Sequence, residues 1–178
     1  MYIQPKVKSS YNKGYDLGRV IYDYTMKVKP NIVAEIGTYR GYSAICIAQA
    51  LRDLGGERKL YCYDLWQKSP HAHCHVNEFK ANIKIHGVEI FVSSSLKSFD
   101  EVIENLSGID MLHIDISNNG DIIKKVYDLR VCNNVIFEGG SKERDNIPWM
   151  KKFLPINGCC PYTILDEHFP SISVIDYE

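Results

Sequence analysis

The sequence lacks the features that would assign it to several broad classes of protein. Its 178 residues contain 21 Lys and Arg against 22 Asp and Glu, so no basic surplus favours nucleic acid as a partner. No window offers the roughly 18 uncharged apolar residues that a membrane span needs. The N-terminal residues MYIQPKVKSS have no apolar core of a secretory signal. We therefore expect a cytoplasmic protein that binds neither nucleic acid nor membrane.

The cysteines also lack any paired spacing. They are Cys46, Cys62, Cys74, Cys132, Cys159 and Cys160. Cys46 and Cys62 lie inside apolar runs, where a free thiol behaves as a small hydrophobic side chain, and reduced thiols fit a cytosolic protein. With 45% hydrophobic residues, the chain is long enough to bury the core of one domain. We expect a helical N-terminal cap over residues 1–30 and a core over 31–178.

What the sequence does contain is a regular alternation of apolar runs and helical patterns. The runs typical of buried strands lie at 31–36, 59–65, 89–93, 110–116 and 134–138. The helical patterns lie at 15–28, 43–54, 77–85, 99–106 and 121–129. Such alternation is typical of a parallel sheet covered on both faces.

The last two apolar runs differ, because the link between them is too short for a crossover helix. They lie at 162–165 and 171–177, so they should pair antiparallel as a hairpin at one edge of the sheet. The predicted fold class is α/β, a Rossmann-like, doubly wound sheet of seven strands that is mostly parallel.

A polar or acidic residue follows every parallel strand. The strand ends carry Glu35, Asp64, residues 93–95, Asp115 and Glu138. In open sheets of this kind, ligands bind beyond the carboxyl ends of the strands. Solvated strand ends would explain part of this pattern, but one ligand shared by all five strands explains it better.

The first strand leads into the stretch VAEIGTYRGYSA, with Gly37 and Gly41 separated by three residues. The dinucleotide fingerprint G-x-G-x-x-G brings backbone N–H groups to a pyrophosphate. Here Glu35 precedes the first glycine and would repel a diphosphate, although it suits a cationic ligand. Asp64, at the next strand end, can accept hydrogen bonds from ribose hydroxyls. A cationic ligand with a ribose and no phosphate fits S-adenosylmethionine.

VAEIGTYRGYSA followed by YDLW resembles the class I S-adenosylmethionine-dependent methyltransferases, and within them the small O-methyltransferases of the catechol and polysaccharide-modifying kind. The resemblance runs from about Tyr15 to Tyr177 and includes the final hairpin. The positions that it implies as cofactor contacts are Glu35, Gly37, Thr38, Tyr39, Gly41, Asp64, Ser95, Leu96 and Asp115.

Several of these positions have a stated role in the resemblance. Glu35 would lie near the cofactor's amino group through water, and Asp64 would hold the ribose. Ser95 would border the adenine, unless it caps a helix. The glycines would let the backbone approach the methionine end, although a tight turn without ligand is the alternative. We expect a side chain at Gly37 to fill the cofactor's place and leave the fold largely intact.

Catechol-type enzymes also bind a divalent cation, usually Mg²⁺, through oxygen ligands that follow strands four and five. Asp115 and Glu138 match two of those ligands, but the third, an asparagine in that pattern, is Gly139 here. The lysine base of that pattern falls near Asn118. His113 shares a strand face with Asp115 and is either the general base or a hydrogen-bonded core residue.

Two further segments have open interpretations. HAHCHV, with His71, His73, Cys74 and His75, could bind zinc, but we favour a loop that borders the substrate mouth. FEGGSKERDNIPWM could contain a mobile flap or a solvated turn, and we expect its Trp149 to pack onto the core.

These observations predict a methyltransferase that acts on the hydroxyl of a small acceptor, such as a sugar or a phenol, and a homodimer is compatible with this interpretation. The alternative is a protein that binds S-adenosylmethionine or S-adenosylhomocysteine with weak or no turnover. A nucleotide-dependent oxidoreductase is disfavoured by the charge of Glu35.

Overall fold

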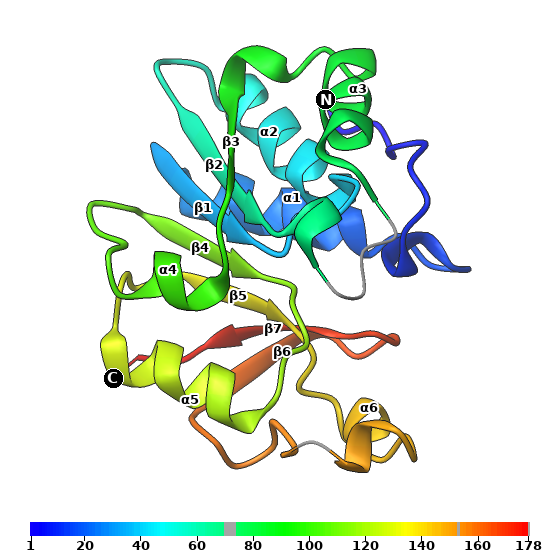
Figure 1. The fold of residues 1–178 in the computed structure, drawn as a ribbon, viewed down its shortest axis with the longest axis vertical. Coiled ribbons are helices and arrows are strands. Elements are labelled where there is room, and N and C mark those ends of the chain that lie inside the picture. The colour runs from blue at the N-terminus through cyan, green and yellow to red at the C-terminus, as the bar shows by residue number, and fades with distance from the viewer. Residues whose placement is uncertain (70–73, 153, 178) are drawn as a thin grey trace.

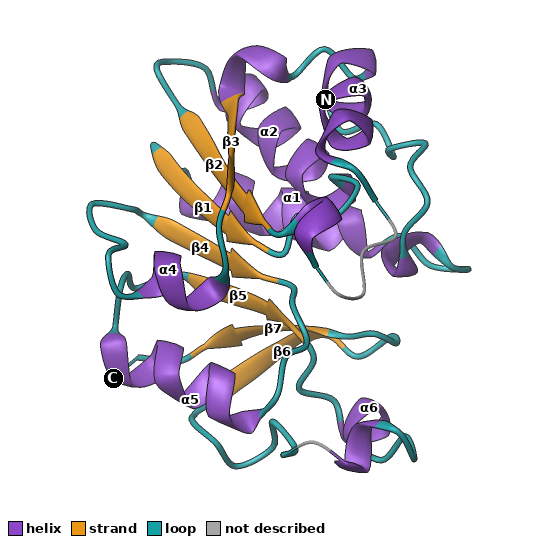
Figure 2. Ribbon diagram, in the orientation of Figure 1, coloured by secondary structure: helices purple, strands orange, loops and turns teal. Residues whose placement is uncertain are grey.

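The structure, a computed structural model, describes residues 1–69, 74–152 and 154–177, and its centre is a seven-stranded sheet (Figures 1 and 2). The strand order is β3-β2-β1-β4-β5-β7-β6. The strands are β1 (Ile32–Ile36), β2 (Lys59–Asp64), β3 (Val92–Leu96), β4 (Met111–Ile114), β5 (Val135–Glu138), β6 (Tyr162–Asp166) and β7 (Ile172–Ile175). β1 to β5 pair in parallel, whereas β7 pairs antiparallel with both β5 and β6. The predicted fold class, including the hairpin at one edge, is confirmed.

Helices cover both faces of the sheet (Figure 2). They are α1 (Leu17–Val28), α2 (Tyr42–Leu54), α3 (Val76–Ile85), α4 (Phe99–Ile103), α5 (Gly120–Leu129) and α6 (Lys142–Asp145). Short 3₁₀ helices are η1 (Ser10–Asn12), η2 (Trp66–Lys68), η3 (Glu89–Phe91) and η4 (Met150–Lys152). Within the described part of the chain, the helices are too short or too polar to cross a membrane.

The strands divide their side chains between two cores because successive residues point to opposite faces. In β1, Val33 packs with α1, α2 and α3, whereas Ala34 and Ile36 pack with α4 and α5. β4 follows the same rule, with Met111 on the first face and Leu112 on the second. Residues two positions apart along a strand therefore share a face of the sheet. This alternation decides which side chains meet at the strand ends.

The third strand begins three residues later than predicted. Glu89–Phe91 forms η3, and β3 is Val92–Leu96, with Val92 paired to Leu60. The prediction of a strand at 89–93 was therefore wrong in its boundary. Ile90 is 70% exposed, so its apolar character reflects no buried strand position.

The segment after β5 forms the short helix α6, with Arg144 and Asp145 buried, so the interpretation as a solvated turn was wrong, whereas the mobile flap stays a prediction. Ser141 caps α6 by accepting a hydrogen bond from the Arg144 amide, and Arg144 pairs with Asp145 at 2.9 Å in a buried site. The expectation for Trp149 was wrong, because this side chain is 55% exposed. All six cysteines are free thiols, as predicted, and four of them are buried.

Candidate active site

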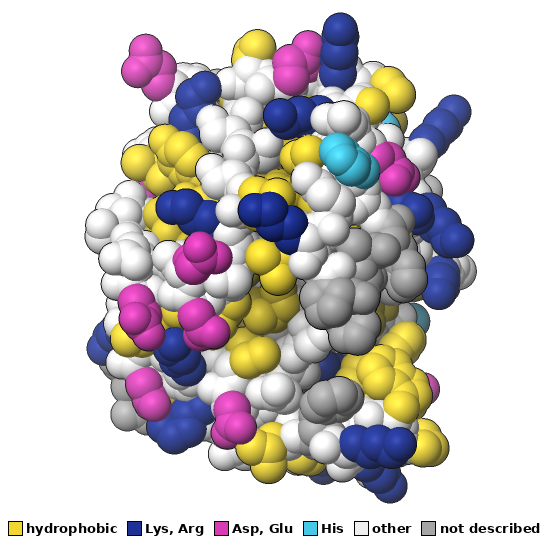
Figure 3. Space-filling model, viewed as in Figure 1, with side chains coloured by type: hydrophobic (Ala, Val, Ile, Leu, Met, Phe, Trp, Pro, Cys, Tyr) yellow, Lys and Arg dark blue, Asp and Glu magenta, His cyan; other side chains and the backbone are white. Residues whose placement is uncertain are grey.

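The largest cavity described, about 470 Å³, lies at the carboxyl ends of the parallel strands. It is lined by Gly37 and Tyr39 after β1, by Asp64 at the end of β2, and by Asp115 after β4. In the view of Figure 3, hydrophobic side chains are exposed near the middle of the molecule. Four of the predicted cofactor-contacting residues thus come together around one cavity.

The loop after β1 has a backbone that needs glycine at two points. Gly37 has a φ of +91° and Gly41 a φ of +87°, both in the left-handed region. A Cβ atom at Gly37 would lie 2.0 Å from the carbonyl oxygen of Asp115. The expectation that a side chain at Gly37 would leave the fold intact is therefore wrong, because the backbone that follows β4 already occupies that space.

Asp64 connects this loop to the turn after β2. One carboxylate oxygen accepts a hydrogen bond from the Tyr39 amide at 2.7 Å, and the other accepts one from the Trp66 amide at 2.6 Å. The Trp66 indole in turn donates to the Tyr39 carbonyl at 2.8 Å. Asp64 is half-buried, so each oxygen keeps a lone pair that can face the cavity.

Glu35 points into the core and lines neither of the two cavities described at this edge. It is fully buried, accepts a hydrogen bond from the Thr38 hydroxyl at 2.8 Å, and lies 2.9 Å from Nδ1 of His113. These contacts fix the start of the loop to β4. His113 is also fully buried, and its ring faces Glu35.

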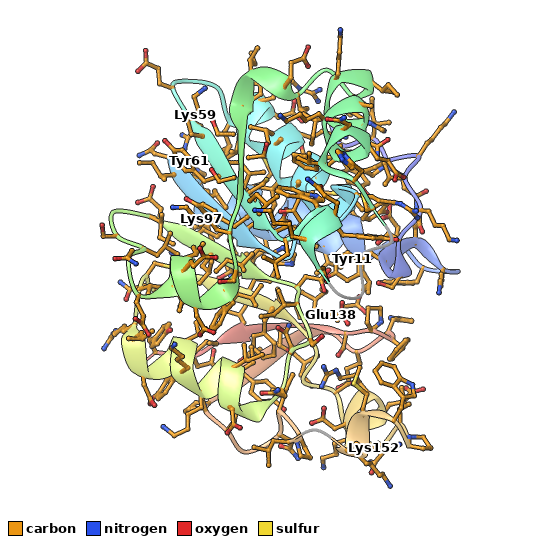
Figure 4. The ribbon with its side chains drawn as sticks, viewed as in Figure 1. Tyr11, Lys59, Tyr61, Lys97, Glu138 and Lys152 are labelled. Atoms are coloured by element: carbon orange, nitrogen blue, oxygen red, sulfur yellow. The ribbon has the colours of Figure 1, made fainter. Side chains whose placement is uncertain are left out.

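Asp115 and Glu138 lie side by side on one face of the sheet. The register pairs His113 with Ile136, so the residues two positions further along meet in the same way. Burial raises the pKa of the Glu138 carboxyl well above its ordinary value, and the adjacent Asp115 carboxylate raises it further. Figure 4 shows Tyr11, from the N-terminal segment, beside Glu138.

Ser95 and Leu96 lie within β3, and neither lines the large cavity. The residues that follow them, Lys97, Ser98 and Phe99, line it instead. Ser98 caps α4 in a reciprocal arrangement with Glu101. The pattern Ser-x-x-Glu is a known helix-start signal, so it could have placed the strand end correctly.

A second cavity, of about 290 Å³, lies between the N-terminal segment and the glycine loop. Thr38 lines it, together with Lys8 and Lys13, and it shares Tyr39 and Asp115 with the large cavity. Asp115 therefore stands between the two cavities.

In the histidine-rich segment, His71 and His73 lie outside the described residues. The alternative of a zinc site there stays a prediction. Cys74 lines the large cavity, and His75 caps α3 by accepting a hydrogen bond from the Asn77 amide at 3.2 Å. The described end of this segment thus borders the cavity.

No group of three His, Cys, Asp and Glu side chains that could hold a metal ion is found in the described ranges. The predicted Mg²⁺ ligands amount to the two carboxyl groups of Asp115 and Glu138. The Asn118 side chain lies close to them, since its amide nitrogen donates to the Glu138 carbonyl at 2.8 Å, and its oxygen has no partner among the described residues.

Two residues near this site were not among the predicted site residues. Tyr11 reaches Asp115 and Glu138 from a segment that shows neither strand nor helix periodicity. Trp66 supports the glycine loop from the turn after β2. Tertiary placement brings Tyr11 to the strand ends, whereas Trp66 lies there because it follows β2 within the stretch YDLW.

Solved structures of methyltransferases share this architecture. An O-methyltransferase from Bacillus cereus, solved with S-adenosylhomocysteine, has a TM-score of 0.64 at 17% identity over 97% of this chain and 84% of that chain. The Podospora anserina methyltransferase PaMTH1 has a TM-score of 0.65 at 16% identity over 90% and 77%. At these identities the likeness establishes the fold.

The sequence comparisons establish the family. Protein y4gI of Sinorhizobium fredii is 28% identical over 92 residues, which span 49% of this chain but only 10% of that protein. A family described as methyltransferase domain matches residues 34–140, which contain the glycine loop, Asp64, Asp115 and Glu138. The chain therefore belongs to the family of methyltransferase domains, in agreement with the methyltransferase resemblance of its sequence.

Proposed function

We propose that this protein transfers the methyl group of S-adenosylmethionine to a hydroxyl of a small-molecule acceptor. The observation that carries the proposal is the large cavity, which joins the glycine loop and Asp64 to Asp115. Its volume of about 470 Å³ lies within the range typical of small-molecule sites. The Streptomyces achromogenes O-methyltransferase TomG, solved with S-adenosylmethionine, has a TM-score of 0.63 at 15% identity and supports the choice of cofactor.

The residues divide the work between binding and chemistry. Asp64 would hold the ribose with the lone pairs that its two backbone hydrogen bonds leave free, and the loop at Gly37 would receive the methionine end. The cofactor supplies an electrophilic methyl group on a sulfonium. The acceptor oxygen would bond to the methyl carbon as the carbon–sulfur bond breaks, and the electron pair of that bond would stay on sulfur.

We assign Asp115 as the general base that takes up the proton of the acceptor hydroxyl. It lines both cavities, so it can receive that proton as the new bond forms, and general-base catalysis of this kind contributes about 10²–10⁴-fold. Alignment of the two reactants contributes separately. His113 remains a second candidate base, although its ring faces Glu35.

A divalent cation is a further part of the proposal. Asp115, Glu138 and the unpartnered amide oxygen of Asn118 are oxygen donors, which Mg²⁺ prefers, and water would complete its coordination. Bound there, the cation would lower the pKa of the acceptor hydroxyl.

One observation favours the alternative of a binding protein with weak turnover. The resemblance implies a lysine base near Asn118, and the Asn118 amide donates instead to the carbonyls of Ile114 and Glu138. This side chain supports the backbone and supplies no base.

The proposal is tested in two steps. Isothermal titration calorimetry with S-adenosylhomocysteine should show binding, and NAD should serve as the negative control. Release of S-adenosylhomocysteine is then measured with a panel of sugars and phenols. Absence of cofactor binding would contradict both functions, whereas binding without release for any acceptor would favour the weak-turnover alternative.

A further inference from the structure

Buried polar atoms without a partner gather behind Asp115. Among the described residues, the Tyr11 hydroxyl, the Asn118 side-chain oxygen and Nε of Arg144 have no hydrogen-bond partner. Asn118 donates to the Glu138 carbonyl, and Arg144 donates to the Asn118 carbonyl at 2.6 Å, so these groups adjoin one another. Buried polar groups in native proteins are nearly always bonded. Such a concentration of unpaired atoms indicates hydrogen bonds that form only when a ligand is bound.

Tyr11 is held in place by its own segment. The Tyr11 amide donates to the Ser9 hydroxyl at 3.1 Å, and the Asn12 side chain donates to the Val7 carbonyl at 3.0 Å. Further towards the N-terminus, Ile3 exchanges two hydrogen bonds with the Gln49 side chain on α2. Hydrogen bonds within the segment therefore fix the backbone around the tyrosine, and Gln49 anchors the segment to α2 on its N-terminal side.

The Tyr11 ring enters the sheet face that carries Asp115 and Glu138. Its side chain is 1% exposed, and its centroid lies 6.2 Å from that of Tyr42 and 6.5 Å from that of His113. Burial raises the pKa of the Tyr11 hydroxyl well above its ordinary value, and the Asp115 and Glu138 carboxyl groups raise it further, so the hydroxyl lies beside both. Its geometry nevertheless falls short of a complete hydrogen bond with any described residue.

Asp115, Tyr11 and Glu138 lie at different depths from the two cavities, and this difference decides which of them an acceptor can contact. Asp115 lines both cavities, whereas Tyr11 and Glu138 line neither. An acceptor can therefore touch Asp115, while Tyr11 can act on the acceptor only through that carboxylate. Catalytic hydrogen bonds are often incomplete without ligands and tighten in the complex.

From this arrangement, which rests on the proposed function, we propose that Tyr11 is a positioning residue for methyl transfer. When the acceptor is seated, the Tyr11 hydroxyl donates a hydrogen bond to one oxygen of Asp115. That bond fixes the other oxygen towards the acceptor hydroxyl. The acceptor oxygen then bonds to the methyl carbon, the electron pair of the broken carbon–sulfur bond stays on sulfur, and the acceptor's proton passes to Asp115.

Tyr11→Phe tests this assignment because it removes only the hydroxyl. The turnover number should fall about tenfold, in line with the loss of one hydrogen bond to a charged group. The KM for the acceptor and the calorimetric Kd for S-adenosylhomocysteine should change little. In an Asp115→Asn background, the same substitution should have no further effect, because the two residues act as one unit.

The melting temperature tests the same inference without an acceptor substrate. Since the Tyr11 hydroxyl is unpaired in the free protein, Tyr11→Phe should leave Tm at or above that of the parent. The matched control is Tyr22→Phe, whose buried ring loses a hydroxyl that donates to Asp53 at 2.7 Å. It should lower Tm by about 2–4 °C and leave turnover unchanged.

The outcomes separate this inference from the proposed function. A Tm for Tyr11→Phe that falls as in the control, a turnover equal to that of the parent, or an additive loss with Asp115→Asn would each overturn the positioning role. If the parent methylates neither catechol nor glucose nor any other member of the panel, the proposed function fails. The Tm comparison would then still decide whether the Tyr11 hydroxyl is unpaired.

Discussion

Gly37 and Gly158 form a matched pair that tests why the glycine loop needs glycine. Their φ angles, +91° and +89°, are nearly equal, so alanine at either position meets the same left-handed strain, about 1–2 kcal/mol. The reduced entropy of the unfolded chain offsets about 0.4–1 kcal/mol of that cost. Because a Cβ atom at Gly158 would meet nothing within 4 Å, Gly158→Ala should destabilise the protein by about 1 kcal/mol.

Gly37→Ala adds a collision to the same strain. Its Cβ atom would lie 2.0 Å from the Asp115 carbonyl oxygen and 2.8 Å from the Ile116 side chain. The first contact is with backbone, so β1 and β4 must separate locally. Forced repacking of this kind costs about 1–3 kcal/mol or more. The total of about 2–4 kcal/mol is a large part of the 5–15 kcal/mol that typically stabilises a domain.

Urea denaturation measures both variants, with the loss taken from the shift in midpoint at constant slope. We expect Gly37→Ala to lower the free energy of unfolding by about 1–3 kcal/mol more than Gly158→Ala does. Its folded fraction should also bind S-adenosylhomocysteine more weakly, because Gly37 and Asp115 both line the large cavity. Equal losses in the two variants would refute the collision argument and leave backbone strain as the whole effect.

Three further predictions concern the side chains at the strand ends. Asp64→Ala should weaken S-adenosylhomocysteine binding by about 1–3 kcal/mol in calorimetry, since it removes the acceptor for ribose hydroxyls; an unchanged Kd would disprove that role. His113→Asn should lower Tm by removing a group 2.9 Å from the buried Glu35 and leave turnover of the folded protein near normal. A base at His113 would instead show a loss of turnover of about 10²-fold. Millimolar Mg²⁺ should raise Tm if Asp115 and Glu138 bind it, and Glu138→Gln should abolish that shift; a parent that shows no shift would end the metal proposal.

The sequence predicts the sheet well because its signals are local and repeated. Buried parallel strands are short apolar runs, and each helix has its own periodicity. The boundary of β3 was missed because Ile90 continues an apolar run although it is exposed in η3. The pattern of apolar residues cannot distinguish such a position from a buried one, whereas the capping signal at Ser98 and Glu101 marks the start of α4 correctly.

The candidate site was predicted less completely because its residues come from distant parts of the chain. Gly37, Tyr39, Asp64 and Asp115 follow strands that could be located, so their meeting was predictable. The approach of Tyr11 depends on how the N-terminal segment docks on α2 through Gln49, and nothing in the pattern of that segment indicates it.

The acidic residues at the strand ends show why a motif alone does not define a binding site. Glu35 accepts a hydrogen bond from the Thr38 hydroxyl and contacts Nδ1 of His113. Both oxygens of Asp64 already accept hydrogen bonds from backbone amides. These carboxylates would have a structural reason to be present even in a protein without ligand. Unused hydrogen-bonding capacity is more informative. A buried polar atom without a partner lowers the stability of the folded protein, so its presence calls for a reason other than folding. On that criterion, the region around Asp115, with the unpaired Tyr11 hydroxyl behind it, is the part of the strand ends most clearly arranged for chemistry.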